Sequence, residues 1–451
     1  MALKLAASNV LVKVLGLLVI VGIPEVPASS QHFTSHDREL AQTMLEVVAS
    51  DVHKDYYDRT IHGIDWDAKV REARDEIAKA TSMAEAYARI AATLEILSDS
   101  HTFFLPPGFD QRVDYGWRFQ MVGDRCYVTQ VRPRSDAQAK GLQPGDRVLT
   151  IDGFAPTRDS LWKMKYALDV LSPQRSLQVE LLKPSRKLLK VDIQASVRRT
   201  QTLVDLDDMS GKDSWRLSLI AEEARRIARV QYAEMGPDLM IMKLPQVTQT
   251  FLEIDGLVDR ARKHKALIMD LRGNPGGNEE SLQNWLAGMF ASDVKIAERL
   301  SRGARTSFAA KGNHNHAFSG KLIVLVDSES ASAAELFARV VQIEKRGIIL
   351  GDHTSGATME AIMYEHATGI NPTYSYAAMV TKAELVMTDG KSLEHLGVTP
   401  DETILPAATD LAGSGDPVMT RAAEMAGVKL DPEHAAKLFP REWPKDSAFP
   451  F

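Results

Sequence analysis

The stretch K-L-I-V-L-V-D-S-E-S-A-S-A-A-E, from Lys321 to Glu335, runs directly into the helical pattern L-F-A-R-V-V. Its first half is a short apolar run rich in Ile and Val, which predicts a buried strand. The small residues after it predict a bend and then a helix, with Ser332 at or near the first turn. A hydroxyl there lies beside unpaired backbone N–H groups, which stabilise an oxyanion. The segment therefore predicts either a nucleophilic serine or one that only caps the helix.

Composition narrows the class of protein. The chain has 451 residues, of which 44% are hydrophobic and 25% charged, as is typical of globular proteins with two or three domains. A formal net charge of −6 argues against nucleic acid as a partner and offers no basic surface for anionic membranes. Cys126 is the single cysteine, so no disulfide forms within the chain. The hydrophobic core must therefore hold the fold together.

The N-terminal segment has the pattern of an export signal. Lys4 and Lys13 precede the apolar run V-L-G-L-L-V-I-V-G-I, and V-P-A at 26–28 offers the small residues at which signal peptidases cleave. The run is too short to span a bilayer comfortably. We therefore expect residues 1–28 to be a signal peptide and the mature protein to be periplasmic or secreted, without a stable membrane anchor. A buried first helix is the alternative.

The rest of the chain divides into four parts. Residues 29–108 repeat apolar positions at i, i+3 and i+4, which predicts a helical N-terminal domain. Residues 109–199 contain short alternating runs, which predict a small β-rich module. From 200 to 410 apolar strands alternate with helical patterns, which predicts an α/β core, and 411–451 is expected to be a closing helix and tail. The predicted fold class is α/β, with several domains.

Four sites carry side chains suited to one reaction. They are L-S-D-S-H-T-F-F-L with His101, M-D-L-R-G-N-P-G-G-N at 269–278, the Ser332 segment, and D-G-K-S-L-E-H-L-G-V-T-P-D with Glu394. A serine hydroxyl is a weak nucleophile until a base takes its proton, and histidine, with a pKa of about 6.5, can do so near neutral pH. N-H-N-H at 313–316 lacks a third metal ligand at a recognisable spacing, so we expect no metal there. No motif predicts a cofactor.

The motifs D-L-R-x-N-P-G-G, S-A-S-A-x-E and G-V-x-P-D together resemble those of the C-terminal processing (tail-specific) serine peptidases. The stretch A-K-G-L-Q-P-G-D-R-V-L-T-I-D-G, at 139–153, resembles the signature of PDZ domains, which bind extended peptide ends by adding a strand to a sheet edge. The resemblance implies a helical N-terminal domain, a PDZ-like domain and a catalytic core built as a crotonase/ClpP-like ββα spiral. It also implies a peptide-binding role for Gly116, Trp117, Arg118 and Phe119.

One departure from that family concerns the general base. In its main branch a lysine follows the nucleophile, and in this chain Ala357 stands at that position, 25 residues after Ser332 (357 − 332). The remaining residues resemble the tricorn-like branch, which uses Ser, His and Glu. The resemblance implies Ser332 as nucleophile, His101 as general base, and Glu394 acting on His101 directly or through Ser100. The implied oxyanion hole consists of Ala333 with Gly276 and Gly277.

We therefore expect a serine endopeptidase that acts on polypeptides, with the PDZ-like domain recognising C-terminal ends. Two other functions stay open: a catalytically inactive binding protein on the same core, such as the interphotoreceptor retinoid-binding protein, and a PDZ-bearing scaffold. At the level of residues, Ser330 competes with Ser332 for the role of nucleophile, and His101 could be structural. Likewise Glu394 could be a surface carboxylate, and D-L-R-G-N-P-G-G only a turn in which Asp270 pairs with Arg272.

Overall fold

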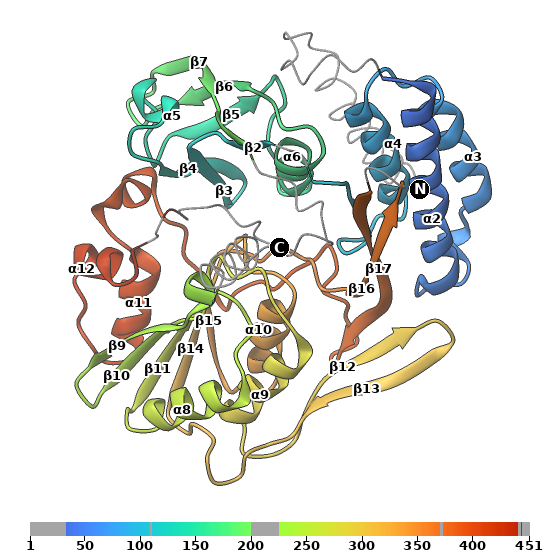
Figure 1. Ribbon diagram of the computed structural model, residues 1–451. Coiled ribbons are helices and arrows are strands. Elements are labelled where there is room, and N and C mark those ends of the chain that lie inside the picture. The colour runs from blue at the N-terminus through green and yellow to red at the C-terminus, as the bar shows by residue number, and fades with distance from the viewer. Residues whose placement is uncertain (1–32, 109–110, 200–224, 370–372, 441–442, 444–451) are drawn as a thin grey trace, which may run out of the picture.

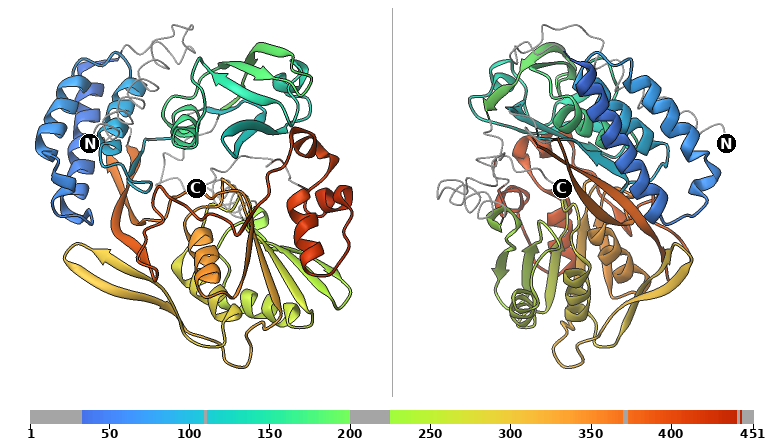
Figure 2. Two further views of the ribbon diagram at one scale, coloured as in Figure 1. Left: turned by 180° about the vertical axis from the view of Figure 1, so that it is seen from behind. Right: turned by 45° about the vertical axis from the view of Figure 1, so that its right-hand side comes forward.

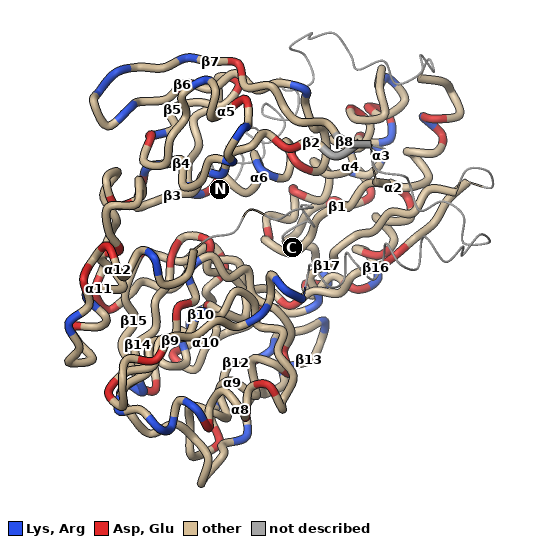
Figure 3. The backbone as a smooth tube through the Cα atoms, turned by 60° about the vertical axis from the view of Figure 1, so that its left-hand side comes forward, with Lys and Arg blue, Asp and Glu red and all other residues tan. Residues whose placement is uncertain are grey.

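The computed structural model describes residues 33–108, 111–199, 225–369, 373–440 and 443. The predicted signal peptide, at 1–28, lies outside the described residues, as does most of the polar stretch that follows the PDZ-like domain. Within the described ranges, no helix is both long and apolar enough to cross a membrane. Figure 3 shows Lys and Arg interspersed with Asp and Glu along the backbone.

The N-terminal part is helical, as predicted. Its helices are α2 (Ser35–Asp55), η1 (Ile61–Gly63), α3 (Trp66–Ile77) and α4 (Met83–Glu95). Polar side chains cap the three α-helices at their N-termini: Thr34 and Asp37 form a capping box on α2, Asp65 caps α3 and Ser82 caps α4. The apolar faces of these helices share a core with Phe104 and with residues of a long strand from the C-terminal half. Figures 1 and 2 show the helices lying along that strand and its partner.

The second part is an antiparallel β-sheet with the strand order β3-β4-β5-β6-β7. Its elements are β3 (Trp117–Val122), β4 (Arg125–Val131), α5 (Asp136–Ala139), β5 (Arg147–Ile151), α6 (Leu161–Tyr166), η2 (Ala167–Leu171), β6 (Ser176–Leu182) and β7 (Leu188–Gln194). The short strands β2 (Gln111–Asp114) and β8 (Ser196–Arg199) pair with each other where the chain enters and leaves this part. Strand β3 lies at the edge of the sheet, where a further strand can add.

The third part, the α/β core, has a sheet with the order β18-β15-β14-β11-β10-β9, parallel except for β9. Its elements are β9 (Gln231–Met235), β10 (Leu239–Lys243), α8 (Phe251–Ala261), β11 (Ala266–Asp270), α9 (Glu279–Met289), β14 (Lys321–Val326), α10 (Ala333–Ile343), β15 (Gly347–Gly351), β18 (Glu402–Thr403), η3 (Asp410–Ser414), α11 (Pro417–Met425) and α12 (Pro432–Lys437). Strands β10, β11, β14 and β15 are apolar strands of the kind that the sequence predicts between residues 200 and 410. The α/β fold class is confirmed.

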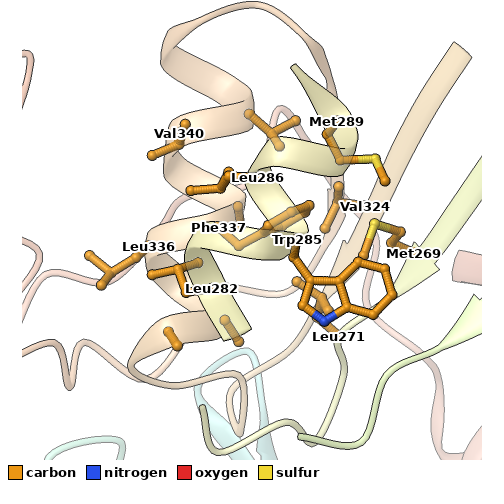
Figure 4. Packing of buried hydrophobic residues seen from close by; sticks show 14 of the residues in the cluster. Met269, Leu271, Leu282, Trp285, Leu286, Met289, Val324, Leu336, Phe337 and Val340 are labelled. Atoms are coloured by element: carbon orange, nitrogen blue, oxygen red, sulfur yellow. The ribbon is translucent and has the colours of Figure 1, made fainter. Parts of the chain in front are cut away.

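Alternation along the central strands explains how both faces of this sheet are covered. Met240 and Met242 of β10 pack under α8, α9 and α10, whereas Leu239 and Ile241 pack under α11 and α12. Figure 4 shows Trp285 of α9 between the strands and α10, with its ring buried among methionine and leucine side chains. Such burial on both faces accounts for the continuous apolar runs in the sequence.

A second sheet joins the helical part to the core, and the sequence did not predict it. Its order is β1-β17-β12-β13, with β16 also paired to β17. The strands are β1 (Phe103–Leu105), β12 (Val294–Ser301), β13 (Ala304–Ala310), β16 (Glu360–Thr368) and β17 (Tyr374–Met387). Because β1 pairs with β17, the segment that contains His101 is anchored to the core. The domain boundaries inferred from sequence stay a prediction.

Candidate active site

Ser332 lies at the turn between β14 and α10. Its backbone has φ 53° and ψ −122°, a conformation that costs a side-chain-bearing residue about 1–3 kcal/mol and persists only where neighbours impose it. The Ser332 N–H donates to the carbonyl oxygen of Ala357 at 2.8 Å and to Glu335 Oε2 at 3.1 Å. A strained strand-to-helix turn of this kind projects a nucleophile out of the sheet.

The neighbouring serines have other partners. The Ser330 side chain is fully buried, and its hydroxyl donates to the Leu271 carbonyl at 2.8 Å and accepts the Asp327 N–H at 2.9 Å. The Ser328 hydroxyl donates to the Met121 carbonyl at 2.6 Å. Among the residues that the structure describes, the Ser332 hydroxyl donates to no acceptor, although its oxygen faces the Glu335 N–H in a capping box at the start of α10. Of the three serines, Ser332 is therefore the one with a hydroxyl available for attack.

Two backbone N–H groups beside Ser332 are suited to bind an oxyanion. Neither the Ala333 N–H nor the Gly277 N–H has an acceptor within the described part of the chain. The Gly276 N–H, in contrast, donates to Asn274 Oδ1 at 2.8 Å, so it is occupied. A Cβ on Gly276 would lie 2.6 Å from the Ser332 Cβ, and one on Gly277 would lie 1.8 Å from the Val247 carbonyl oxygen. Both positions therefore require glycine, and only Gly277 keeps its N–H available.

His101 belongs to a hydrogen-bonded chain of three side chains. The Ser100 hydroxyl lies 2.7 Å from His101 Nδ1 and donates to Glu394 Oε2 at 3.0 Å, and the Ser100 N–H donates to Glu394 Oε1 at 2.7 Å. An ionised Glu394 carboxylate can only accept hydrogen bonds, so the single proton of the Ser100 hydroxyl is directed to Glu394. Ser100 must then accept a hydrogen bond from Nδ1–H, which leaves the Nε2 lone pair of His101 for use as a base. The structure thus places Ser100 between His101 and Glu394.

Burial shifts the pKa values of both titratable groups. It lowers the pKa of His101, and the charge of Asp99 acts in the opposite direction. It raises the pKa of Glu394, whose carboxylate also accepts the Thr358 N–H at 2.9 Å. A neutral imidazole with a lowered pKa stays unprotonated at mildly acid pH, as a general base requires.

Asp99 fixes the backbone on which Ser100 and His101 lie. Its Oδ1 accepts the His101 N–H at 3.0 Å and the Thr381 hydroxyl at 2.6 Å, and its Oδ2 accepts the Tyr56 and Thr102 hydroxyls, each at 2.9 Å. This buried network connects α2, β1 and β17. Sequence reasoning quoted Asp99 in the histidine segment without assigning it a role, because its partners lie far away in the chain.

Glu335 is a second residue that sequence reasoning did not assign. It is fully buried in the first turn of α10, and its carboxylate accepts the N–H groups of Ser332, Gly356 and Ala357 and the Thr354 hydroxyl. Burial raises the pKa of Glu335 to about 7, against the effect of these hydrogen bonds. The carboxylate thereby links the Ser332 turn to the loop at 354–358. The glutamate of the S-A-S-A-x-E motif is the feature of the sequence that could have indicated this role.

The loop at 354–358 connects Ser332 to the hydrogen-bonded chain Glu394–Ser100–His101. Ala357 accepts the Ser332 N–H, and the next residue, Thr358, donates its N–H to Glu394. Within the described residues, no hydrogen bond joins the Ser332 hydroxyl to the His101 ring. Catalytic hydrogen bonds are often long without substrate and tighten in the complex, so this geometry does not exclude His101 as the base.

The Asp270 and Arg272 side chains have a structural role. Arg272 Nη2 lies 2.9 Å from Asp270 Oδ2 and 2.8 Å from Asp416 Oδ2, at the N-terminus of α11. The pairing of Asp270 with Arg272 that the sequence left open as an alternative is present. The ion pairs of Arg272 connect the glycine-containing turn after β11 to the C-terminal helices and do not reach Ser332.

The four residues expected to bind peptide lie at the start of β3. Gly116 has φ +75°, and a Cβ there would lie 2.4 Å from the Ser135 Cβ. Trp117 and Phe119 are buried in the core of the PDZ-like domain and stack with their ring centroids 4.6 Å apart. Only Arg118 among the three side chains is exposed. A peptide added to this edge would therefore meet Arg118 and the β3 backbone first.

The far end of β3 contacts the loop that leads to Ser332. Gln120 Nε2 donates to Asp327 Oδ2 at 2.6 Å, and Lys165 Nζ lies 2.7 Å from Glu329 Oε1. Arg158 adds an ion pair with Asp352 at 2.7 Å. The PDZ-like domain is thus attached to the segment directly before the nucleophile.

Comparisons with known proteins identify two parts of the chain. Residues 228–404 match peptidase family S41, and residues 113–194 match the PDZ domain. The chain is 24% identical over 396 residues to the chloroplastic C-terminal processing peptidase of Tetradesmus obliquus, covering 80% of this chain and 77% of that one. It is 25% identical over 278 residues to the tail-specific protease of Haemophilus influenzae, covering 57% of this chain and 36% of that one.

Solved structures show the same fold. Mature CPAF aligns over 84% of this chain and 95% of its own, with a TM-score of 0.62 and 13% identity. The photosystem II D1 C-terminal processing protease aligns over 88% and 99%, with a TM-score of 0.50 and 19% identity. At these identities the likeness concerns the fold alone.

Proposed function

We propose that this chain is a serine peptidase in which Ser332 cleaves polypeptides with His101 as its general base. The matches of residues 228–404 to peptidase family S41 and of residues 113–194 to the PDZ domain support this proposal. His101 Nε2 takes the Ser332 proton while Oγ attacks the scissile carbonyl carbon. The oxyanion of the tetrahedral intermediate accepts hydrogen bonds from the Ala333 and Gly277 N–H groups. His101 then gives the proton to the leaving amine, and the acyl group stays on Ser332.

Hydrolysis of the acyl-enzyme uses the same groups. His101 removes a proton from water, the resulting hydroxide attacks the ester carbonyl, and the Ser332 oxygen leaves and recovers its proton from His101. Glu394 stabilises the imidazolium through the Ser100 hydroxyl in both half-reactions. The single observation that carries this proposal is the hydrogen-bonded chain Glu394–Ser100–His101, formed by segments 294 residues apart.

We further propose that the PDZ domain binds the C-terminal ends of substrates along β3 and delivers them toward Ser332. Two relatives are named for processing C-termini or acting on tails, and the contacts of Gln120 and Lys165 with the nucleophile loop give such binding a route to the active site. Export is also part of the proposal. N-terminal sequencing of the mature protein is expected to begin directly after Ala28.

Labelling with a fluorophosphonate probe tests the catalytic assignment. The wild type is expected to react, and Ser332→Ala and His101→Ala are expected to lose labelling. Ser355→Ala is the matched control, because Ser355 is an exposed serine of the loop beside Ser332 and has no assigned role. Labelling that survives Ser332→Ala would refute the assignment of the nucleophile.

A non-catalytic binding protein is the second candidate, and one observation favours it: the Ser332 hydroxyl and the His101 ring, both described, are not hydrogen-bonded. This candidate predicts no labelling in any variant, with or without added C-terminal peptides. It also predicts that an unfolded polypeptide remains uncleaved after prolonged incubation. Cleavage that depends on both Ser332 and His101 would exclude it.

A further inference from the structure

Trp443, near the C-terminus of the sequence, lies against two arginines of the PDZ domain. Its ring centroid is 5.0 Å from the Arg118 guanidinium carbon and 5.8 Å from that of Arg132. Both distances fall within the range at which a guanidinium and an aromatic ring attract each other. The contact joins two segments more than 300 residues apart in sequence, and nothing in the catalytic mechanism requires it.

The two arginines frame the place where a peptide would add to the domain. Arg118 projects from the edge strand β3, and Arg132 follows β4 directly. Arg132 forms an ion pair with Asp114, and its N–H donates to the Gly116 carbonyl at 2.8 Å. Asp114 in turn accepts the Gly116 N–H at 2.7 Å. Arg132 is therefore fixed to the turn that opens β3, beside Arg118 of the strand itself.

The C-terminal part of the chain already lies beside this domain. Helix η3 contacts β4, and the Ala408 carbonyl approaches Gly145 so closely that a Cβ there would lie 2.2 Å from its oxygen. Figure 1 shows α11 and α12 below β4, between the PDZ domain and the parallel sheet. Trp443 lies six positions after Lys437, the end of α12, and six residues can span about 20 Å. The tether is long enough to bring Trp443 onto β3 without displacing α12.

We propose that Arg118 and Arg132 form an aromatic-binding subsite on the peptide-binding edge of the PDZ domain, and that Trp443 of the same chain occupies it in competition with substrates. This inference deepens the proposed function and rests on the PDZ domain being its peptide-binding module. The ligands that fit are polypeptide ends with a tryptophan or another aromatic residue near the terminus. The chain's own segment, being tethered, competes at a high effective concentration.

Binding of a labelled peptide that copies residues 438–445 tests the inference by fluorescence anisotropy. The full chain carries Ser332→Ala so that the peptide is not cleaved. Adding Trp443→Ala is expected to tighten binding by about tenfold, the amount that two such contacts contribute at partly exposed sites. Trp443→Phe is the matched control: it keeps an aromatic ring and is expected to bind the peptide nearly as weakly as the parent.

Two further arms identify the subsite. A peptide in which alanine replaces the tryptophan is expected to bind the Trp443→Ala chain about tenfold more weakly. Adding Arg118→Ala to that chain is expected to cancel its gain in affinity, and because Arg118 is exposed the substitution should leave the fold intact. Equal affinity of the Trp443→Ala and parent chains, or equal binding of the two peptides, would overturn the inference.

The outcomes separate this inference from the proposed function. A chain that cleaves polypeptides through Ser332 but gains no affinity on Trp443→Ala keeps its peptidase assignment and loses the subsite. A chain that shows the gain but neither cleaves nor reacts with the fluorophosphonate keeps the subsite and loses the catalytic assignment.

Discussion

The Ser332 N–H donates a 2.8 Å hydrogen bond to the carbonyl oxygen of Ala357, the residue at the position where the resemblance to the main branch of the tail-specific peptidases would place a lysine. The alanine methyl cannot accept a proton, yet the backbone at this position still holds Ser332. The next residue, Thr358, connects the same loop to Glu394. The loop therefore connects Ser332 to the hydrogen-bonded chain Glu394–Ser100–His101. An alanine at position 357 is for this reason compatible with catalysis.

Glu335, in α10, accepts hydrogen bonds from this loop. The first prediction concerns Glu335. In Glu335→Gln, one carboxylate oxygen becomes an NH2 group that faces N–H donors, so at least one buried donor loses its acceptor. We expect the free energy of unfolding to fall by about 2–4 kcal/mol, measured by urea denaturation. Glu344→Gln is the control, because Glu344 is exposed at the end of the same helix. Its stability should stay within about 0.5 kcal/mol of the wild type.

The difference in stability between the wild type and Glu335→Gln is also expected to depend on pH. Burial raises the pKa of Glu335 from 4.5 to about 7, so the folded protein binds this proton more tightly than the unfolded chain does. The resulting stabilisation is fully present below about pH 4.5 and is lost as the pH rises through about 7. The stability of the wild type relative to Glu335→Gln should therefore fall between about pH 5 and pH 8. A relative stability that rises over this range would show that Glu335 is ionised throughout.

The second prediction is that Ser100 positions His101. Ser100→Ala removes the hydroxyl between Nδ1 and Glu394, so the imidazole loses its orientation and the imidazolium its counter-charge. We expect kcat to fall by about 10- to 100-fold with little change in KM, as is usual when a partner that orients a catalytic group is lost. The measurement is steady-state cleavage of a quenched peptide. Ser100→Thr keeps the hydroxyl and should retain most of the activity, whereas a drop in both variants would indicate a packing effect.

Local sequence patterns predicted the elements around the nucleophile well. The apolar run at 321–326 and the small residues after it identify β14 and the Ser332 turn because both depend on neighbours in the chain. The order of motifs also brought Ser100, His101 and Glu394 together as candidates. Their geometry was beyond prediction, since Glu394 lies 294 residues from Ser100 and only the folded chain places its carboxylate against that hydroxyl.

Long-range pairing explains what the sequence did not predict. Strand β17 pairs with β1 and β12, which lie far from it in the chain, so neither pairing has a local signal. For the same reason Asp99 could not be assigned, because Thr381 reaches it from β17. The sequence also could not predict which glycine N–H is available to an oxyanion. Gly276 and Gly277 are adjacent in sequence, and they differ because the Asn274 side chain accepts the Gly276 N–H.

The third prediction is the pH profile of kcat/KM. A general base must be neutral, so activity is lost as the pH falls through the pKa of His101. Burial lowers this pKa from its ordinary value of 6.5, and we expect the acid limb to have its midpoint below pH 6.5. Asp99 raises the pKa of His101 by its charge, so Asp99→Asn should move the midpoint to still lower pH.

The control for this profile is Asp159→Asn, which changes an exposed carboxylate on the PDZ domain and should leave the midpoint unchanged. Thermal unfolding of Asp99→Asn shows whether the fold survives loss of the buried carboxylate. A midpoint that moves upward in Asp99→Asn, or a profile flat from about pH 5 to 9 in the wild type, would rule out His101 as the base.

The fourth prediction separates the oxyanion donors by two glycine substitutions. In Gly277→Ala the new Cβ would lie 1.8 Å from the Val247 carbonyl oxygen, so the turn must move and carry its N–H away from the reacting carbonyl. Loss of one oxyanion donor typically lowers kcat by about 10²–10³, and we expect a fall in that range from single-turnover cleavage. Gly256→Ala is the matched control, since Gly256 lies within α8 and a Cβ there meets nothing within 4 Å. It should leave kcat unchanged and stabilise the protein by about 0.5–1 kcal/mol, because alanine favours a helix over glycine. If Gly277→Ala folds with the stability of the wild type and retains full kcat, the Gly277 N–H does not bind the oxyanion, and the Ala333 N–H must act with a different donor.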